Sequence, residues 1–123
     1  MIEQPMLIGG QTAQASNGAT FERRNPLDGS VATRAPAATA ADAVRAVEAA
    51  QAAFPAWAAL GPTQRRQMLM KASQALAAKA DAFAAAMAAE TGASGIWAGF
   101  NVHLSANMLL EAAALTTQIN GQV

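Results

Sequence analysis

The sequence predicts a mixed fold in which short β-strands come first and α-helices follow. Three observations carry this prediction. Short strand-like runs separated by turn residues fill residues 1–38, a helix start signal stands at Thr39, and apolar residues then recur every three or four positions up to the end of the chain. A chain of 123 residues is long enough for one domain. We therefore expect a strand region, 1–38, and a helical region, 39–123.

The strand region is predicted to contain three strands. Their sequences are MLIGGQ at residues 6–11, TFERR at residues 20–24 and SVATRAP at residues 30–36. The corner NPLDGS joins the last two. Pro26 fixes φ for the first central position of a turn, Asp28 can accept from its own backbone and Gly29 can take a positive φ. These residue types predict a hairpin turn rather than a ligand-binding loop.

The first helix is predicted to begin at the Thr39 cap, with Asp42 three residues later, and to run to Phe54. Its modest apolar face consists of Val44, Val47 and Phe54. The stretch FPAWAALGP should interrupt the helical pattern.

The second helix should begin near Thr63, directly after Pro62. Its expected buried stripe is Leu69, Ala72, Leu76, Ala80, Phe83 and Met87. A break near Asp81 and a stop at Gly92 are expected, and Ser94 should cap a last helix over residues 96–119. The stripe of that helix is Phe100, Leu104, Met108, Ala112, Leu115 and Ile119, and Asn120 and Gly121 should end it.

Composition excludes several classes of function. Eight basic and eight acidic residues cancel, so neither nucleic acid nor an anionic membrane surface is an expected partner. There is no cysteine, and therefore no disulfide, thiolate metal site or cysteine nucleophile. The start MIEQPM does not resemble a secretory signal, and Lys79 and Asp81 break the most apolar run, so we expect a soluble cytoplasmic protein.

Short strands and alanine-rich helices bury little apolar area by themselves. The chain is therefore expected to be a piece of something larger. A free-standing helical interaction module is the alternative.

Individual residues give weak catalytic signals. His103 is the sole histidine and has no evident partner group, so a structural or surface role is expected. The glycine pairs do not build a phosphate cradle, and Arg65 with Arg66 is most simply a solvated helix face. Trp97 and Phe100 could belong to a core or line an apolar pocket, and helical spacing alone favours the core.

Several motifs occur together in a specific order. They are the NP corner followed by Gly before a strand, the alanines leading to Phe54 and Trp57, an Arg and Leu in the next helix, and the ETG that closes it. In this order they resemble the N-terminal part of the NAD(P)-dependent aldehyde dehydrogenase superfamily, over residues 7–123. The stretch from Trp97 to Val123 further resembles the salicylaldehyde and vanillin dehydrogenase branch, whose substrates are aromatic aldehydes.

The resemblance implies an α/β, Rossmann-like fold in which residues 1–123 are the first part of the cofactor-binding domain. It also implies oxidation of an aldehyde, aromatic in the branch named above, to its carboxylic acid with NAD or NADP, in a homodimer or homotetramer. In the family, the cysteine nucleophile, the glutamate, the oxyanion-hole asparagine and the cofactor residues all lie downstream. The chain alone is therefore expected to be inactive.

Two sets of site residues follow from the resemblance. Positions corresponding to Phe100 and Leu104 face the substrate tunnel in the family, and Trp97, one turn earlier, is expected to join them. Many members also hold a monovalent cation with backbone carbonyls just before the NP and an acid near the ETG. Those positions correspond to Arg23, Arg24 and Glu90.

Overall fold

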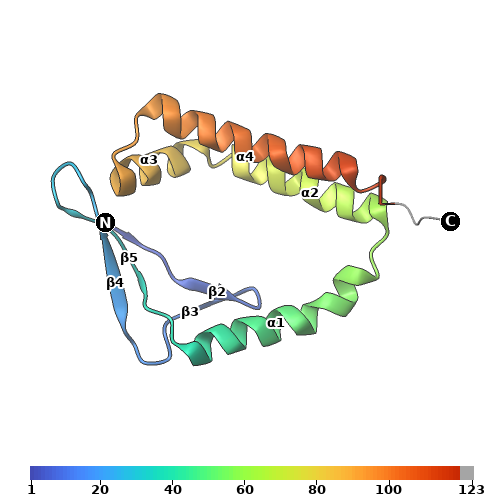
Figure 1. Cartoon of the computed structure of the whole chain (residues 1–123), viewed down its shortest axis with the longest axis horizontal. Coiled ribbons are helices and arrows are strands. Elements are labelled where there is room, and N and C mark those ends of the chain that lie inside the picture. Colours follow the sequence, from blue (N-terminus) through green and yellow to red (C-terminus); the bar gives the residue numbers. More distant parts are fainter. Residues whose placement is uncertain (120–123) are drawn as a thin grey trace. The chain divides into compact units, whose positions relative to one another are not determined.

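The computed structural model describes residues 1–119 (Figure 1). Within it the chain forms two compact units. The first contains residues 1–59 together with residues 89–91, and the second contains residues 60–88 together with the chain from Gly92 onward. Each unit is described separately below.

The first unit contains two small sheets. The strands are β1 (Ile2–Glu3), β2 (Met6–Ile8), β3 (Gln11–Ala13), β4 (Thr20–Arg24) and β5 (Val31–Pro36). One sheet has the order β1-β5-β4, with β1 parallel and β4 antiparallel to the central strand β5. The other sheet is the antiparallel pair β2-β3. The predicted strands at 20–24 and 30–36 are thus confirmed as β4 and β5.

The prediction of one strand over residues 6–11 was wrong. That segment folds back on itself as the β2-β3 hairpin, in which Leu7 pairs with Thr12. Gly9 and Gly10 form the two-residue turn with φ values of 59° and 78°. Two successive positive φ values are what a type I′ hairpin turn requires, and glycine adopts them without steric cost. The Gly-Gly pair is thus a turn signal, and β1 was not predicted at all.

The corner Asn25–Ser30 joins β4 to β5 as predicted. Its backbone closes on itself, since Gly29 N–H donates to the Asn25 carbonyl at 2.8 Å and Asn25 N–H donates to the Ser30 carbonyl at 2.9 Å. Asp28 Oδ1 accepts from both the N–H and the hydroxyl of Ser30, which keeps the pKa of Asp28 below its ordinary value. Gly29 has a φ of 73°. The turn residues therefore satisfy one another.

Helix α1 (Ala40–Ala58) begins at the predicted Thr39 cap. The Asp42 carboxylate is 1% exposed and accepts several hydrogen bonds. The donors are the backbone N–H groups of Thr39 and Ser16, the hydroxyl groups of the same two residues, and the Arg45 guanidinium. These donors hold the pKa of Asp42 well below its ordinary value, the Thr39 N–H being the largest cause and the Ser16 N–H the next. One carboxylate thus caps α1 and fixes the loop that follows β3.

The predicted end of this helix at Phe54 was wrong, because α1 continues through Pro55 to Ala58. Pro55 has no N–H to offer the carbonyl one turn earlier, which removes one helical hydrogen bond. Its own carbonyl accepts from Ala59 N–H at 3.1 Å, so the ladder resumes beyond the proline. The alanine-rich sequence has enough helix propensity to tolerate the lost bond.

The second unit is helical. It contains α2 (Pro62–Ala77), most of α3 (Ala80–Thr91) and α4 (Gly95–Leu115). Pro62 opens α2, and the expected break falls at Ala78 and Lys79. Gly92 ends α3 with a φ of 70°, as predicted.

Ser94 caps α4 by accepting from Trp97 N–H, as expected, but α4 ends earlier than the predicted residue 119. The hydroxyls of Thr116 and Thr117 donate to the carbonyls of Ala113 and Ala114. Such local bonds compete with continuation of the helix. The predicted stop residues, Asn120 and Gly121, lie outside the described part of the chain.

Replacing Asp42 tests the buried cap. Asp42→Asn should lower the melting temperature at pH 7, because an amide accepts fewer of these hydrogen bonds and carries no charge opposite Arg45. Since the pKa of Asp42 is lowered in the folded state, its contribution is full above the unfolded pKa of about 3.9 and is lost as the pH falls further. The difference between variant and wild type should therefore shrink in thermal melts below about pH 4.

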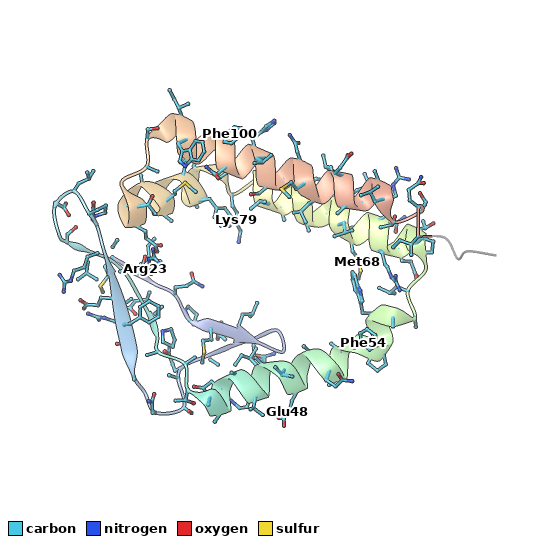
Figure 2. All side chains as sticks on the ribbon, in the orientation of Figure 1. Arg23, Glu48, Phe54, Met68, Lys79 and Phe100 are labelled. Carbon is cyan, nitrogen blue, oxygen red and sulfur yellow. The ribbon has the colours of Figure 1, made fainter. Side chains whose placement is uncertain are left out.

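Glu48→Asn is the matched control, since Glu48 is an exposed carboxylate on the same helix (Figure 2). It should leave the melting temperature nearly unchanged at every pH. An equal loss in the two variants would contradict the role assigned to Asp42.

Candidate functional site

Helix α4 packs on α2 through small side chains. Its buried residues are Ala98, Val102, Ala106 and Ala113. Between the two helices, the buried Ser73 hydroxyl of α2 donates to the Ala106 carbonyl at 2.8 Å. Alanine at a helix contact lets the two backbones approach closely, which is what this interhelical hydrogen bond requires.

The predicted stripe of α4 is not the buried one. Phe100, Leu104, Met108 and Leu115 are 50%, 43%, 65% and 55% exposed, so the core role that helical spacing alone favoured for Phe100 does not hold in the described chain. The apolar face predicted for α1 is likewise exposed, with Val44, Val47 and Phe54 at 56%, 68% and 60%. In both helices, regular spacing identified an apolar face correctly but did not reveal what covers it.

An open hollow lies at the N-terminal end of α4. It has a volume of about 430 Å³ and is lined by Ser94, Ile96, Trp97 and Phe100. The rings of Trp97 and Phe100 stack with centroids 5.4 Å apart and planes inclined by 25°. Leu104 is not part of this lining and lies one turn further along the helix. The structure therefore brings together two of the three predicted substrate residues.

The chemistry available to this hollow is limited by its lining. The stacked rings and Ile96 offer apolar surface, and the Ser94 hydroxyl already serves as a helix cap. Such a wall suits a flat apolar ring. None of the four lining side chains has a group that exchanges a proton near neutral pH. The hollow can therefore hold a ligand but cannot perform acid-base or nucleophilic chemistry.

The second predicted site lies on the sheet of β4 and β5. Arg23 pairs with Thr33 across the two strands, and Glu22 pairs with Arg34. Because successive side chains point to opposite faces of a sheet, each cross-strand pair occupies its own face. On one face Arg34 donates to Glu22 at 3.0 Å, which is the main cause of a lowered Glu22 pKa.

On the other face, Arg23 and Thr33 both bind Glu90 from the last turn of α3. The Thr33 hydroxyl donates to Glu90 Oε1 at 2.5 Å, and Arg23 Nε lies 3.1 Å from Oε2. Thr33 is 5% exposed. Sequence reasoning missed Thr33, because the contact joins residues 57 positions apart and only the strand register reveals it.

Arg24, the remaining residue of the predicted cation site, has other partners. Its guanidinium contacts Glu22 at 2.7 Å and the Gly29 carbonyl at 3.1 Å. A small cation bound to Glu90 would lie near the Arg23 guanidinium. Two positive charges about 4 Å apart repel by roughly 1 kcal/mol in water and roughly 4 kcal/mol at an effective dielectric constant of about 20. The Glu90 side chain therefore does not fit a cation while Arg23 holds it.

Other candidate residues add no reactive group. His103 is exposed, and its Nε2 lies 3.0 Å from Asn107 Nδ2 one turn along α4. Among residues 1–119, no group of three or more histidine or acidic side chains could hold a metal ion. None of the helices within that range is long and apolar enough to cross a membrane.

Solved structures identify the larger fold to which this segment corresponds. A salicylaldehyde dehydrogenase from Pseudomonas putida G7, complexed with salicylaldehyde, superposes with a TM-score of 0.96 at 42% identity over 99% of this chain. An NAD-dependent aldehyde dehydrogenase from Sinorhizobium meliloti superposes with a TM-score of 0.93 at 28% identity over 98% of this chain. The segment thus has the α/β fold of aldehyde dehydrogenases, as predicted.

The chain belongs to the aldehyde dehydrogenase family, whose profile matches residues 13–123. A vanillin dehydrogenase from Pseudomonas fluorescens is 57% identical over the whole chain. The chain spans about a quarter of the length of these relatives, 25% of the vanillin dehydrogenase, 25% of the salicylaldehyde dehydrogenase and 24% of the Sinorhizobium protein. The predicted family is therefore confirmed.

The close contact between α2 and α4 can be tested by filling it. Ala113→Leu should destabilise the protein by roughly 1–3 kcal/mol, because Ala113 is 1% exposed and the added methylene groups would have to displace its neighbours. Ala114→Leu is the matched control, since Ala114 is exposed on the same helix. Chemical denaturation of both variants measures the difference. Equal stability of the two would mean that α4 packs through another face.

Proposed function

We propose that this chain is the N-terminal part of an NAD(P)-dependent dehydrogenase that oxidises an aromatic aldehyde to its carboxylic acid. The observation that carries the proposal is the 57% identity with a vanillin dehydrogenase over all 123 residues. The exposed apolar faces of α1 and α4 add support, because in a longer protein they would be covered by the rest of the chain.

In this proposal, Trp97 and Phe100 form one wall of the substrate site. Their stacked rings present a flat apolar surface about the size of a benzene ring. Leu104, 43% exposed one turn further along α4, extends the same wall. These residues position the aldehyde and exclude water. They supply no nucleophile, and with no cysteine in the sequence that chemistry must come from residues beyond this chain.

The cofactor and assembly state are part of the same proposal. NAD or NADP would accept the hydride and would be bound downstream of residue 123, where the cofactor-binding residues of the family lie. We infer a homodimer or homotetramer, and a cytoplasmic location, from the family. A free-standing interaction module stays the alternative, because the exposed apolar faces would also serve a protein partner.

Aldehyde oxidation by the isolated chain and by the full-length protein, measured side by side, tests the proposal and separates it from the interaction module. Purified residues 1–123 should form no NADH from vanillin or benzaldehyde and NAD, because they lack a cysteine nucleophile. The full-length protein under the same conditions is the positive control. Turnover by the isolated chain would refute the assignment of the chemistry to downstream residues, and a full-length protein without any turnover would favour the interaction module.

The aromatic wall is tested in the full-length protein by Phe100→Ala. Loss of ring contact should raise the Michaelis constant for benzaldehyde or vanillin by roughly 3- to 10-fold and that for acetaldehyde much less. Leu115→Ala is the matched control, an equally exposed apolar residue of α4 outside the hollow. Equal effects on the aromatic and aliphatic aldehydes would count against this wall.

A further inference from the structure

We propose that the Arg23 guanidinium takes the place of the monovalent cation at Glu90, so that this site needs no bound ion. The resemblance to the family implies a cation held near Arg23, Arg24 and Glu90. The described side chains around Glu90 instead supply their own positive charge. The inference depends on family membership and not on the proposed substrate.

Glu90 stands where a positive charge is needed. It lies in the last turn of α3, at the end of a helix that carries partial negative charge on its free carbonyl groups. No basic residue of α3 lies in that turn to offset this charge. A carboxylate at a helix C-terminus is unfavourable unless a cation from another element faces it.

Arg23 is held in position to be that cation. The strand register places it directly opposite Thr33, and the two side chains each engage one oxygen of the Glu90 carboxylate. Thr33 is buried and its hydroxyl fixes the carboxylate, which leaves the second oxygen directed to Arg23 Nε. The Arg23 side chain is 52% exposed and that of Glu90 is 25% exposed, so the pair lies at the surface, but the strand register sets the position of the guanidinium.

The charges of this sheet also balance without an ion. Three carboxylates and three guanidinium groups pair with one another: Glu3 with Arg34, Glu22 with Arg24 and Arg34, and Glu90 with Arg23. An added cation at Glu90 would leave the network with excess positive charge. The repulsion from Arg23 corresponds to roughly five- to thousand-fold weaker ion binding.

The test measures thermal unfolding of the full-length protein in potassium, sodium and tetramethylammonium chloride at equal ionic strength. The wild-type midpoint should be the same in the three salts. Arg23→Gln should lower the midpoint in tetramethylammonium chloride by up to about 1 °C, and sodium or potassium should restore most of that loss. An Arg23→Gln loss that is equal in all three salts overturns the proposal.

Three controls make the result specific. Arg24→Gln removes a positive charge from the adjacent strand position but not the partner of Glu90, and should create no cation dependence. Arg23→Lys keeps the charge and should stay independent of the salt. Glu90→Gln removes the negative charge. Any dependence of its unfolding midpoint on the cation must come from another part of the protein, and this dependence is subtracted from that of Arg23→Gln.

A wild-type measurement keeps the proposal falsifiable if Arg23→Gln fails to fold. The wild-type protein is titrated with sodium, and binding is monitored by sodium NMR. We expect no saturable sodium binding at Glu90, that is, none that is lost in Glu90→Gln. Saturable binding that disappears in Glu90→Gln overturns the proposal. Neither measurement uses an aldehyde, so the proposed substrate can fail while this inference stands.

Discussion

Alanine on the inner face of α4 sets how closely α4 approaches α2. This close approach determines which side chains of α4 are buried and which are exposed. The contact leaves room for the Ser73 hydroxyl to reach the Ala106 carbonyl but not for large side chains. Phe100 and its neighbours along the predicted stripe therefore point away from α2. The aromatic surface of the candidate site exists because the helix contact is made by the smallest residues available.

Local signals in the sequence predicted three structures that depend on their immediate neighbours. The Thr39 cap with Asp42, the Gly92 stop and the Asn25–Ser30 corner all formed as predicted, because each satisfies backbone groups within a few residues. The Gly9-Gly10 hairpin was missed although its signal is equally local. Its residues were included in a strand because the apolar run before them was given more weight than the two glycines.

The candidate sites depend on information that spacing does not contain. A period of three or four residues marks an apolar face of α4, but both the alanine face and the large-residue face have that period, and only packing on α2 selects between them. The contact of Thr33 with Glu90 depends on the register of β4 and β5, and no pattern within either segment specifies it. The family resemblance predicted that Glu90 belongs to a site. It did not predict which side chains of this chain contact Glu90.

The register of β4 against β5 also carries information about charge. In the observed alignment, Arg23 faces Glu90, while Glu22 faces Arg34 on the opposite side of the sheet. A one-residue slip that sets Glu22 opposite Thr33 would bring Glu22 toward Glu90, so that two carboxylates would meet at the negative end of α3. That misaligned pairing is disfavoured electrostatically, whereas the opposite slip would bring Arg24 to the same place. Strand β4 has five exposed residues and little apolar surface to select its alignment, so the opposite charges of Glu22 and Arg23 on its two faces contribute to that selection.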